Sequence, residues 1–267
     1  MIPGTGLIPI HDENPTHSKP ITTIILIVLN VLAFLLLEPQ FGSTRDCLRS
    51  DLACQIDNCE VSQFFFKWGI VPAEVVQGEQ LTGEICSGVE AEPKSVMLSL
   101  LTSMFLHGGF LHLAGNMLFL WVFGNTIEDR LKPAKFVLFY LVTGIIASLA
   151  HVFFNASSQV PTIGASGAVA GVLGGYILLF PRAMVHTLVG FILFFRVRLP
   201  AITVLGLWFV SQFFIGGGQQ VGEGGVAWVA HVGGFLAGMA LIHLMGGGRA
   251  RPTPAQPVYP AGPYGAL

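Results

Sequence analysis

Long apolar runs separated by shorter polar stretches dominate the chain. Residues 21–37 form an almost unbroken aliphatic run of 17 residues, and a helix needs about 17 to 25 such residues to cross a bilayer core. From residue 98 onward similar runs recur, and they predict helices at residues 111–123, 136–154, 166–180, 201–215 and 226–245. The pattern therefore predicts an all-α, polytopic membrane protein with a bundle of six transmembrane helices.

The composition agrees with a membrane protein. Of the 267 residues, 52% are hydrophobic and 10% are charged, whereas charged residues make up about 25% of a typical soluble domain. The formal net charge of −2 provides no field that would gather nucleic acid. We therefore expect the lipid bilayer, and not nucleic acid, as a partner.

The positions of lysine and arginine predict the orientation. If both termini are cytoplasmic, nine basic residues fall on one side, as the positive-inside rule requires: Lys19, Arg130, Lys132, Lys135, Arg182, Arg196, Arg198, Arg249 and Arg251. The apolar stretch 185–199 contains two of these arginines, so it is expected to be a cytoplasmic interfacial segment.

This orientation divides the chain into three parts. Residues 1–20 are predicted to be a cytoplasmic segment, residues 21–245 the membrane domain, and residues 246–267 a disordered, proline-rich cytoplasmic tail. The location is expected to be the cell membrane, inner or plasma.

A polar insertion, residues 38–95, separates the first two apolar runs. It contains 10 of the 15 acidic residues and all four cysteines, Cys47, Cys54, Cys59 and Cys86. With cytoplasmic termini this loop is external, where disulfides persist, so one or two disulfides are expected, in any of three full pairings. Free thiols are the alternative. Zinc is disfavoured, because the usual Cys and His spacings are missing.

Polar side chains from three predicted helices share one shallow level on the external side. Ser166 opens the helix at 166–180, His231 lies near the external end of the helix at 226–245, and His112 lies near the external start of the helix at 111–123. Polar groups at membrane depth normally face the protein interior and indicate function. The pattern predicts a site that opens to the external side.

Small residues indicate how two of these helices can meet. Gly167 and Gly171 lie four residues apart on one helix, as do Gly234 and Gly238 on another, and this spacing allows backbones to approach closely. A close crossing would bring the imidazole of His231 within hydrogen-bonding reach of Ser166. The alternative is two packing grooves whose polar residues are incidental.

The helix at 111–123 adds hydrogen-bond donors. His112 and Asn116 lie one turn apart and share a face, and together with the Ser166 N–H they are suited to stabilise a developing oxyanion. Interhelical hydrogen bonding is the alternative. A metal site at His107, His112 and His231 is disfavoured, because no carboxylate at that depth would complete it.

The acidic residues near this helix lie at its opposite end. Glu128 and Asp129 are predicted at the cytoplasmic end, where Glu128 and Arg130 are expected to hold the loop. A Ser-His-Asp triad therefore lacks its third member, and a Ser-His dyad is predicted. A nucleophile elbow is excluded, because position 168 is alanine where that motif needs glycine.

These residues together resemble the rhomboid family of intramembrane serine proteases. The resemblance covers residues 98–243 and rests on motifs that fall in family order: His107-x4-His112-x3-Asn116, Glu128-Asp129-Arg130, Gly164-x-Ser166-Gly167 and His231-Val232-Gly233-Gly234. It implies cleavage of membrane-anchored proteins within or beside a transmembrane segment, without a cofactor or a metal.

The resemblance also implies roles for individual residues. Ser166 would be the nucleophile and His231 the base, with His112, Asn116 and Gly164 around the oxyanion and the substrate. Many family members have an aromatic residue four positions after the serine to support the histidine ring, whereas this chain has Ala170. A catalytically silent relative that binds transmembrane helices is the alternative; a transporter or channel is disfavoured by the lack of intramembrane carboxylates.

Overall fold

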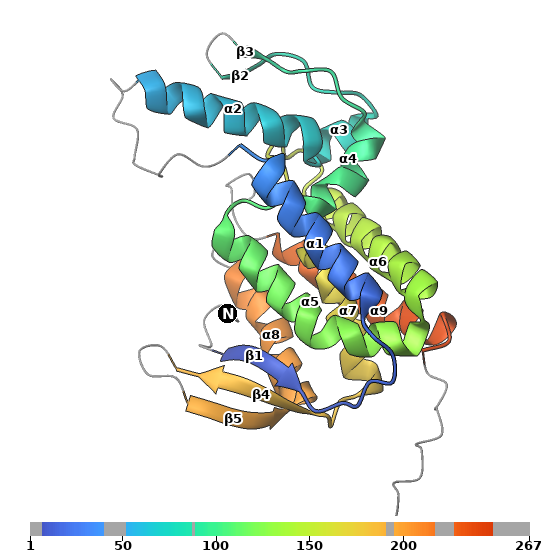
Figure 1. The fold of residues 1–267 in the computed structure, drawn as a ribbon. Coiled ribbons are helices and arrows are strands. Elements are labelled where there is room, and N and C mark those ends of the chain that lie inside the picture. Colours follow the sequence, from blue (N-terminus) through green and yellow to red (C-terminus); the bar gives the residue numbers. More distant parts are fainter. Residues whose placement is uncertain (1–6, 40–51, 87–88, 191–194, 217–226, 248–267) are drawn as a thin grey trace, which may run out of the picture.

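A computed structural model describes residues 7–39, 52–86, 89–190, 195–216 and 227–247. Each of the apolar runs forms a helix of the central bundle (Figure 1): α1 (Ile21–Leu36), α5 (Phe110–Leu131), α6 (Pro133–Phe154), α7 (Ser166–Leu179), α8 (Ala201–Gly216) and α9 (Trp228–Leu244). Helices α5 and α6 are long and apolar enough to cross a membrane, whereas the other four are apolar but shorter. The number of spans therefore stays a prediction.

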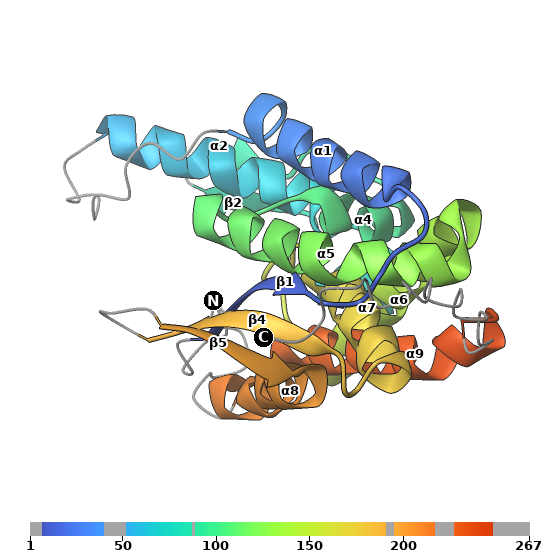
Figure 2. The same cartoon turned by 60° about the horizontal axis from the view of Figure 1, so that its bottom comes forward.

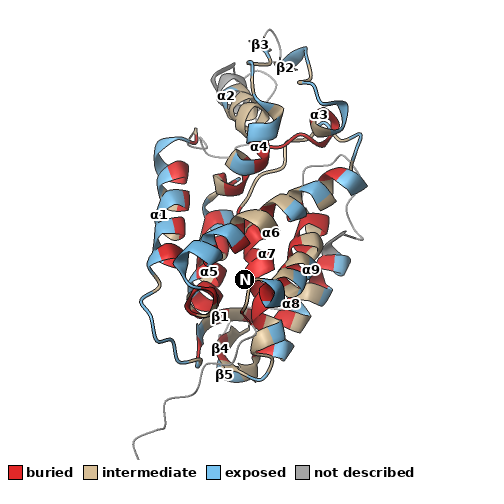
Figure 3. Cartoon of the chain, turned by 90° about the vertical axis from the view of Figure 1, so that its right-hand side faces the viewer, coloured by how far each residue is buried: buried red, intermediate tan, exposed pale blue. Residues whose placement is uncertain are grey.

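Helix α7 lies at the centre of the bundle. Residues 167–176 are all buried, and Figure 3 shows this helix enclosed by its neighbours while α1 lies at the periphery. Its neighbours are mainly α5, α6 and α9. The small residues of α7 allow this central position, because a helix without bulk can be approached from several sides.

The outside of the bundle is apolar. Leu111 is 85% exposed, Phe214 80% and Leu36 72%. Apolar surface of this extent would be unfavourable in water but is favourable against lipid. The bundle therefore has an apolar surface outside and a packed core around α7.

The insertion between α1 and α5 has secondary structure of its own: α2 (Leu52–Trp68), α3 (Pro72–Gln77), β2 (Glu84–Cys86), β3 (Val89–Glu90), α4 (Val96–Thr102) and a 3-10 helix η1 (Ser103–Phe105). It lies at the end of the bundle where α7 begins (Figure 1). Ile70 and Thr162 exchange backbone hydrogen bonds of 3.1 and 2.8 Å. The insertion thereby holds the segment that leads into Ser166.

The cysteines of the insertion are described in part. Cys59 on α2 is disulfide-bonded. Cys47 and the side chains of Cys54 and Cys86 lie outside the described residues, so the pairing stays a prediction.

The all-α expectation is wrong at the opposite end of the bundle. Strands β1 (Leu7–Asp12), β4 (Met184–Val189) and β5 (Phe195–Pro200) form an antiparallel sheet in the order β1-β4-β5, which Figure 2 shows beside α5, α7 and α8. The expected interfacial segment at 185–199 is thus the hairpin β4-β5. Its arginines alternate with apolar residues, because only one face of the sheet packs on the helices.

A buried carboxylate ties this sheet to the bundle. Asp12 of β1 accepts hydrogen bonds from the Tyr176 hydroxyl of α7 at 2.7 Å and from the Thr126 hydroxyl of α5 at 2.9 Å. Burial raises the pKa of Asp12, although these hydrogen bonds oppose the shift. The N-terminal strand is therefore an integral part of the fold. The tail at 248–267 lies outside the described residues.

Glu128 connects α5 to the start of α1. Its carboxylate oxygens accept from the backbone N–H groups of Thr22 and Thr23, both at 2.8 Å, and from the Thr23 hydroxyl at 2.8 Å. The first N–H groups of a helix have no partner within the helix, so the carboxylate satisfies them from outside. Nearby, the Arg130 guanidinium lies 4.9 Å from the ring centroid of Phe180.

Replacing Glu128 with alanine is expected to lower the free energy of unfolding by about 2 to 3 kcal/mol, because buried N–H donors of α1 lose a charged acceptor. Glu128→Gln keeps one acceptor oxygen and is expected to lose less. Denaturant unfolding of the detergent-solubilised variants measures both differences. Equal stability of Glu128→Ala and the unmodified protein would contradict this role.

Candidate active site

Ser166 and His231 meet where α7 and α9 cross. Ser166 is the first residue of α7, and His231 lies in the first turn of α9. The distance from Ser166 Oγ to His231 Nε2 is 2.7 Å, a normal hydrogen-bond length for this pair. His231 is 9% exposed. A serine hydroxyl and a buried imidazole therefore form a partly buried pair.

Glycines allow the two helices to approach this closely. A Cβ atom at Gly234 would lie 2.1 Å from the Gly167 carbonyl oxygen, and a Cβ at Gly238 would lie 1.9 Å from the Gly171 carbonyl oxygen. Helix α9 thus packs its glycines directly on the backbone of α7. The Cα atoms of Gly167 and Gly171 themselves face α6, because a Cβ there would meet Ala147 and Thr143.

Gly164 lies between the serine and His112. A Cβ at this position would lie 2.9 Å from His112 Cε1 and 3.5 Å from Ser166 Oγ, and the φ angle is +130°. Both the space and the backbone conformation favour glycine. The Gly164 N–H donates to the Ser103 carbonyl at 2.8 Å. The ring of His112 therefore packs against the loop just before Ser166.

Asn116 lies one turn further along α5. The residue is 8% exposed, and its Nδ2 donor has no hydrogen-bond partner within the described part of the chain. An unpaired donor in a buried place is unfavourable unless another group uses it. Asn116 is thus a donor that the protein's own described groups leave unused.

His107 supports His112 from the loop before α5. The two rings lie 5.2 Å apart, edge to face, and the backbone N–H of His107 donates to Glu38 Oε1 at 2.9 Å. Burial, helped by the nearby His112, lowers the pKa of His107 to about 3, so its ring is neutral at pH 7. Burial raises the pKa of Glu38 to about 7.

Two residues around His231 were not expected from the sequence. Gln212 Oε1 lies 2.7 Å from His231 Nδ1, and the Trp208 ring lies 5.9 Å from the imidazole, tilted by 37°. Position 170 on α7 is a buried alanine and provides no ring. The aromatic neighbour of the histidine is Trp208 of α8. The available signal was a glutamine one turn after a tryptophan on an otherwise apolar helix.

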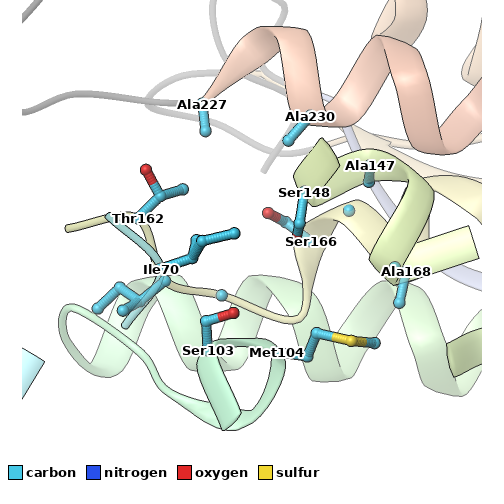
Figure 4. A pocket seen from close by; sticks show the side chains of 14 residues that line it. Ile70, Ser103, Met104, Ala147, Ser148, Thr162, Ser166, Ala168, Ala227 and Ala230 are labelled. Carbon is cyan, nitrogen blue, oxygen red and sulfur yellow. The ribbon is translucent and has the colours of Figure 1, made fainter. Parts of the chain in front are cut away.

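A small pocket, partly open to the outside, lies beside Ser166. Figure 4 shows it between Ser166 and the loop that carries Thr162, with Ala227 and Ala230 on one side and Ser103 and Met104 on the other. Small and apolar side chains form most of its wall. The Ser166 hydroxyl therefore has free space on the side away from the core.

Metal chemistry finds no support among the described residues, which contain no group of three or more His, Cys, Asp or Glu side chains placed to hold an ion. His107 and His112 are close, but the neighbouring Glu38 carboxylate accepts from the His107 backbone N–H and does not form such a group with the two rings.

A helical bundle with an apolar exterior and a partly buried serine-histidine pair defines the class: a helical membrane protein with a serine-histidine pair near one end. The rhomboid domain model matches residues 94–247, so the chain belongs to the rhomboid family, whose members are integral membrane proteins. The resemblance that the motifs indicated is confirmed.

Several relatives are similar over the same region. Rhomboid protease GluP of Bacillus subtilis is 32% identical over 65% of this chain and 28% of its own length. Rhomboid protein 1, mitochondrial, of Saccharomyces cerevisiae is 32% identical over 53% and 40%. Rhomboid protease GlpG of Salmonella paratyphi A is 24% identical over 52% and 45%. The chain thus spans less than half of each of these relatives.

Proposed function

We propose that this protein is a serine endopeptidase that cleaves membrane-anchored proteins within or beside a transmembrane segment. The observation that carries the proposal is the 2.7 Å contact between Ser166 Oγ and His231 Nε2, beside a pocket that Ser166 itself lines. The names of the relatives GluP and GlpG, both rhomboid proteases, support it.

The proposed reaction follows the chemistry of a Ser-His dyad. His231 Nε2 takes the proton of the Ser166 hydroxyl while its oxygen attacks the peptide carbonyl carbon. The imidazolium then donates that proton to the leaving amine, and the acyl-enzyme remains. Water hydrolyses the acyl-enzyme, with His231 again as the base. No cofactor enters this sequence.

Donors near Ser166 are proposed to stabilise the oxyanion. The Ser166 N–H lies at the start of α7, where helical N–H groups are unpaired within the helix. Asn116 Nδ2 is buried without a partner among the described groups, and the His112 ring packs on Gly164 beside the serine. Removing one such donor typically lowers the rate by about 10²- to 10³-fold.

We further propose that both termini are cytoplasmic and that the site opens to the external side of the cell membrane. This orientation puts the basic residues around the sheet on the cytoplasmic side and the disulfide-bonded Cys59 on the oxidising side. Substrates would be transmembrane proteins whose helix unwinds locally. Segments with small or helix-breaking residues should unwind most readily, so cleavage is expected there.

The test uses purified protein with a single-span membrane substrate and a fluorophosphonate probe. We expect the unmodified protein to cleave the substrate and to be labelled, and Ser166→Ala to do neither. The alternative is a silent rhomboid protein that binds transmembrane helices. In that case the unmodified protein would leave the substrate intact and would not be labelled, while it and Ser166→Ala would both still capture the substrate. That result would overturn the proposal.

A further inference from the structure

The side of His231 away from Ser166 contacts a single amide. Gln212 Oε1 lies 2.7 Å from His231 Nδ1, and Gln212 is 1% exposed. No acidic side chain among the described residues hydrogen-bonds to His231, whose partners are Gln212 and Ser166. The position that a carboxylate holds in a catalytic triad is therefore taken by a neutral amide.

The other end of this amide fixes its orientation. Gln212 Nε2 donates to the Trp208 carbonyl at 2.9 Å and to Ser211 Oγ at 3.2 Å, and the Ser211 hydroxyl donates to the same Trp208 carbonyl at 2.6 Å. A carbonyl oxygen only accepts, so the NH2 group must face Trp208. Oε1 must then face His231.

This orientation selects the tautomer of the histidine. Oε1 only accepts, so His231 Nδ1 carries the proton and Nε2 keeps its lone pair. That lone pair points to the Ser166 hydroxyl at 2.7 Å, which is the arrangement that a general base needs. The reverse tautomer would set the Nδ1 lone pair against Oε1 and leave both acceptors unpaired.

Helix α8 also restricts the ring from a second direction. Trp208 and Gln212 lie one turn apart on α8 and share a face, and the Trp208 ring is 5.9 Å from the imidazole. One element therefore supplies both an aromatic neighbour and a hydrogen-bond acceptor. An amide suits this depth, because an ionised carboxylate among apolar helices is costly.

We infer that Gln212 is a positioning residue that holds His231 in the Nδ1-protonated tautomer, with its ring directed at Ser166. The inference rests on the proposed function, because it assigns His231 the role of the base. It extends the dyad to a Gln212-His231-Ser166 chain in which the amide orients the imidazole and touches no substrate.

The test compares Gln212→Met with Gln212→Glu. Methionine has a similar size but provides no oxygen acceptor, so kcat for the single-span substrate is expected to fall by about 10²-fold, part of what general-base catalysis contributes, with little change in KM. Glutamate keeps an acceptor oxygen whether or not it is ionised, so it is expected to restore most of the lost kcat. Fluorophosphonate labelling should follow kcat in both variants.

Val210→Ala is the matched control on α8, because Val210 is 49% exposed on the outside of the bundle. It should leave kcat and labelling unchanged, and unfolding midpoints check that all variants are folded. Unchanged kcat in Gln212→Met, or equal losses in Gln212→Met and Gln212→Glu, would overturn the inference. Failure of the unmodified protein to cleave or to be labelled would instead reject the proposed function.

Discussion

Replacing His231 with alanine is expected to lower substrate cleavage and fluorophosphonate labelling by about 10³-fold or more, since the serine then lacks its base. His231 Nε2 is 2.7 Å from Ser166 Oγ, and no other described side chain hydrogen-bonds to that hydroxyl. An unassisted serine hydroxyl is a weak nucleophile at neutral pH.

The labelling rate separates acylation from substrate binding, because the probe needs no transmembrane helix to be recognised. His243→Ala is the matched control: His243 lies on the same helix but is exposed near its other end, so it should retain both activities. If His231→Ala kept the labelling rate of the unmodified protein, His231 would not be the base.

Replacing Gly238 with alanine is expected to lower the free energy of unfolding by about 3 kcal/mol or more. The new Cβ would lie 1.9 Å from the Gly171 carbonyl oxygen and 2.6 Å from its carbonyl carbon. These are backbone atoms that cannot rotate away, so α9 must move off α7. Because His231 lies on α9, cleavage is also expected to fall by about 10²-fold, the effect of a misplacement of roughly 1 Å.

Gly206→Ala on α8 is the control for the change from glycine to alanine. A Cβ there meets nothing within 4 Å, so this variant should be as stable as the unmodified protein, or more stable by up to about 1 kcal/mol through helix propensity. Denaturant unfolding and substrate cleavage measure both variants. Equal behaviour of Gly238→Ala and Gly206→Ala would contradict the close packing of α9 on α7.

The sequence pattern predicts the end of the bundle with Ser166 and His231 better than the end with the sheet. Ser166 and His231 lie at predicted helix ends, and their glycines indicate a close crossing before any coordinates are known. The sheet was missed, because β1 and β4 are separated by most of the chain and their pairing from Leu7 with Val189 to Asp12 with Val185 leaves no mark on either segment alone. The arginines in 185–199 alternate with apolar residues as in a strand, but basic residues also fit a cytoplasmic interfacial segment, so their pattern does not distinguish the two.

Apart from the Ser166–His231 pair, the polar contacts were predictable as residue types but not as pairs. Glu128 was expected at the end of its helix, yet its partners Thr22 and Thr23 come from the start of α1. Because position 170 is alanine, the sequence did not show which residues support the His231 ring. The structure shows that Trp208 and Gln212 do so, and they lie on a helix whose polar residues carried no motif.

Hydrophobic run length and residue chemistry, both local properties, were sufficient to predict the helices and the serine-histidine pair, and the resemblance of the motifs indicated the family. The tertiary structure decided which atoms meet: the 65-residue separation of Ser166 and His231 closes to 2.7 Å, and the histidine gains an amide partner from a third helix. Hydrogen bonds extend over about 3 Å, so the packing of helices, which is not a local property, determines their partners.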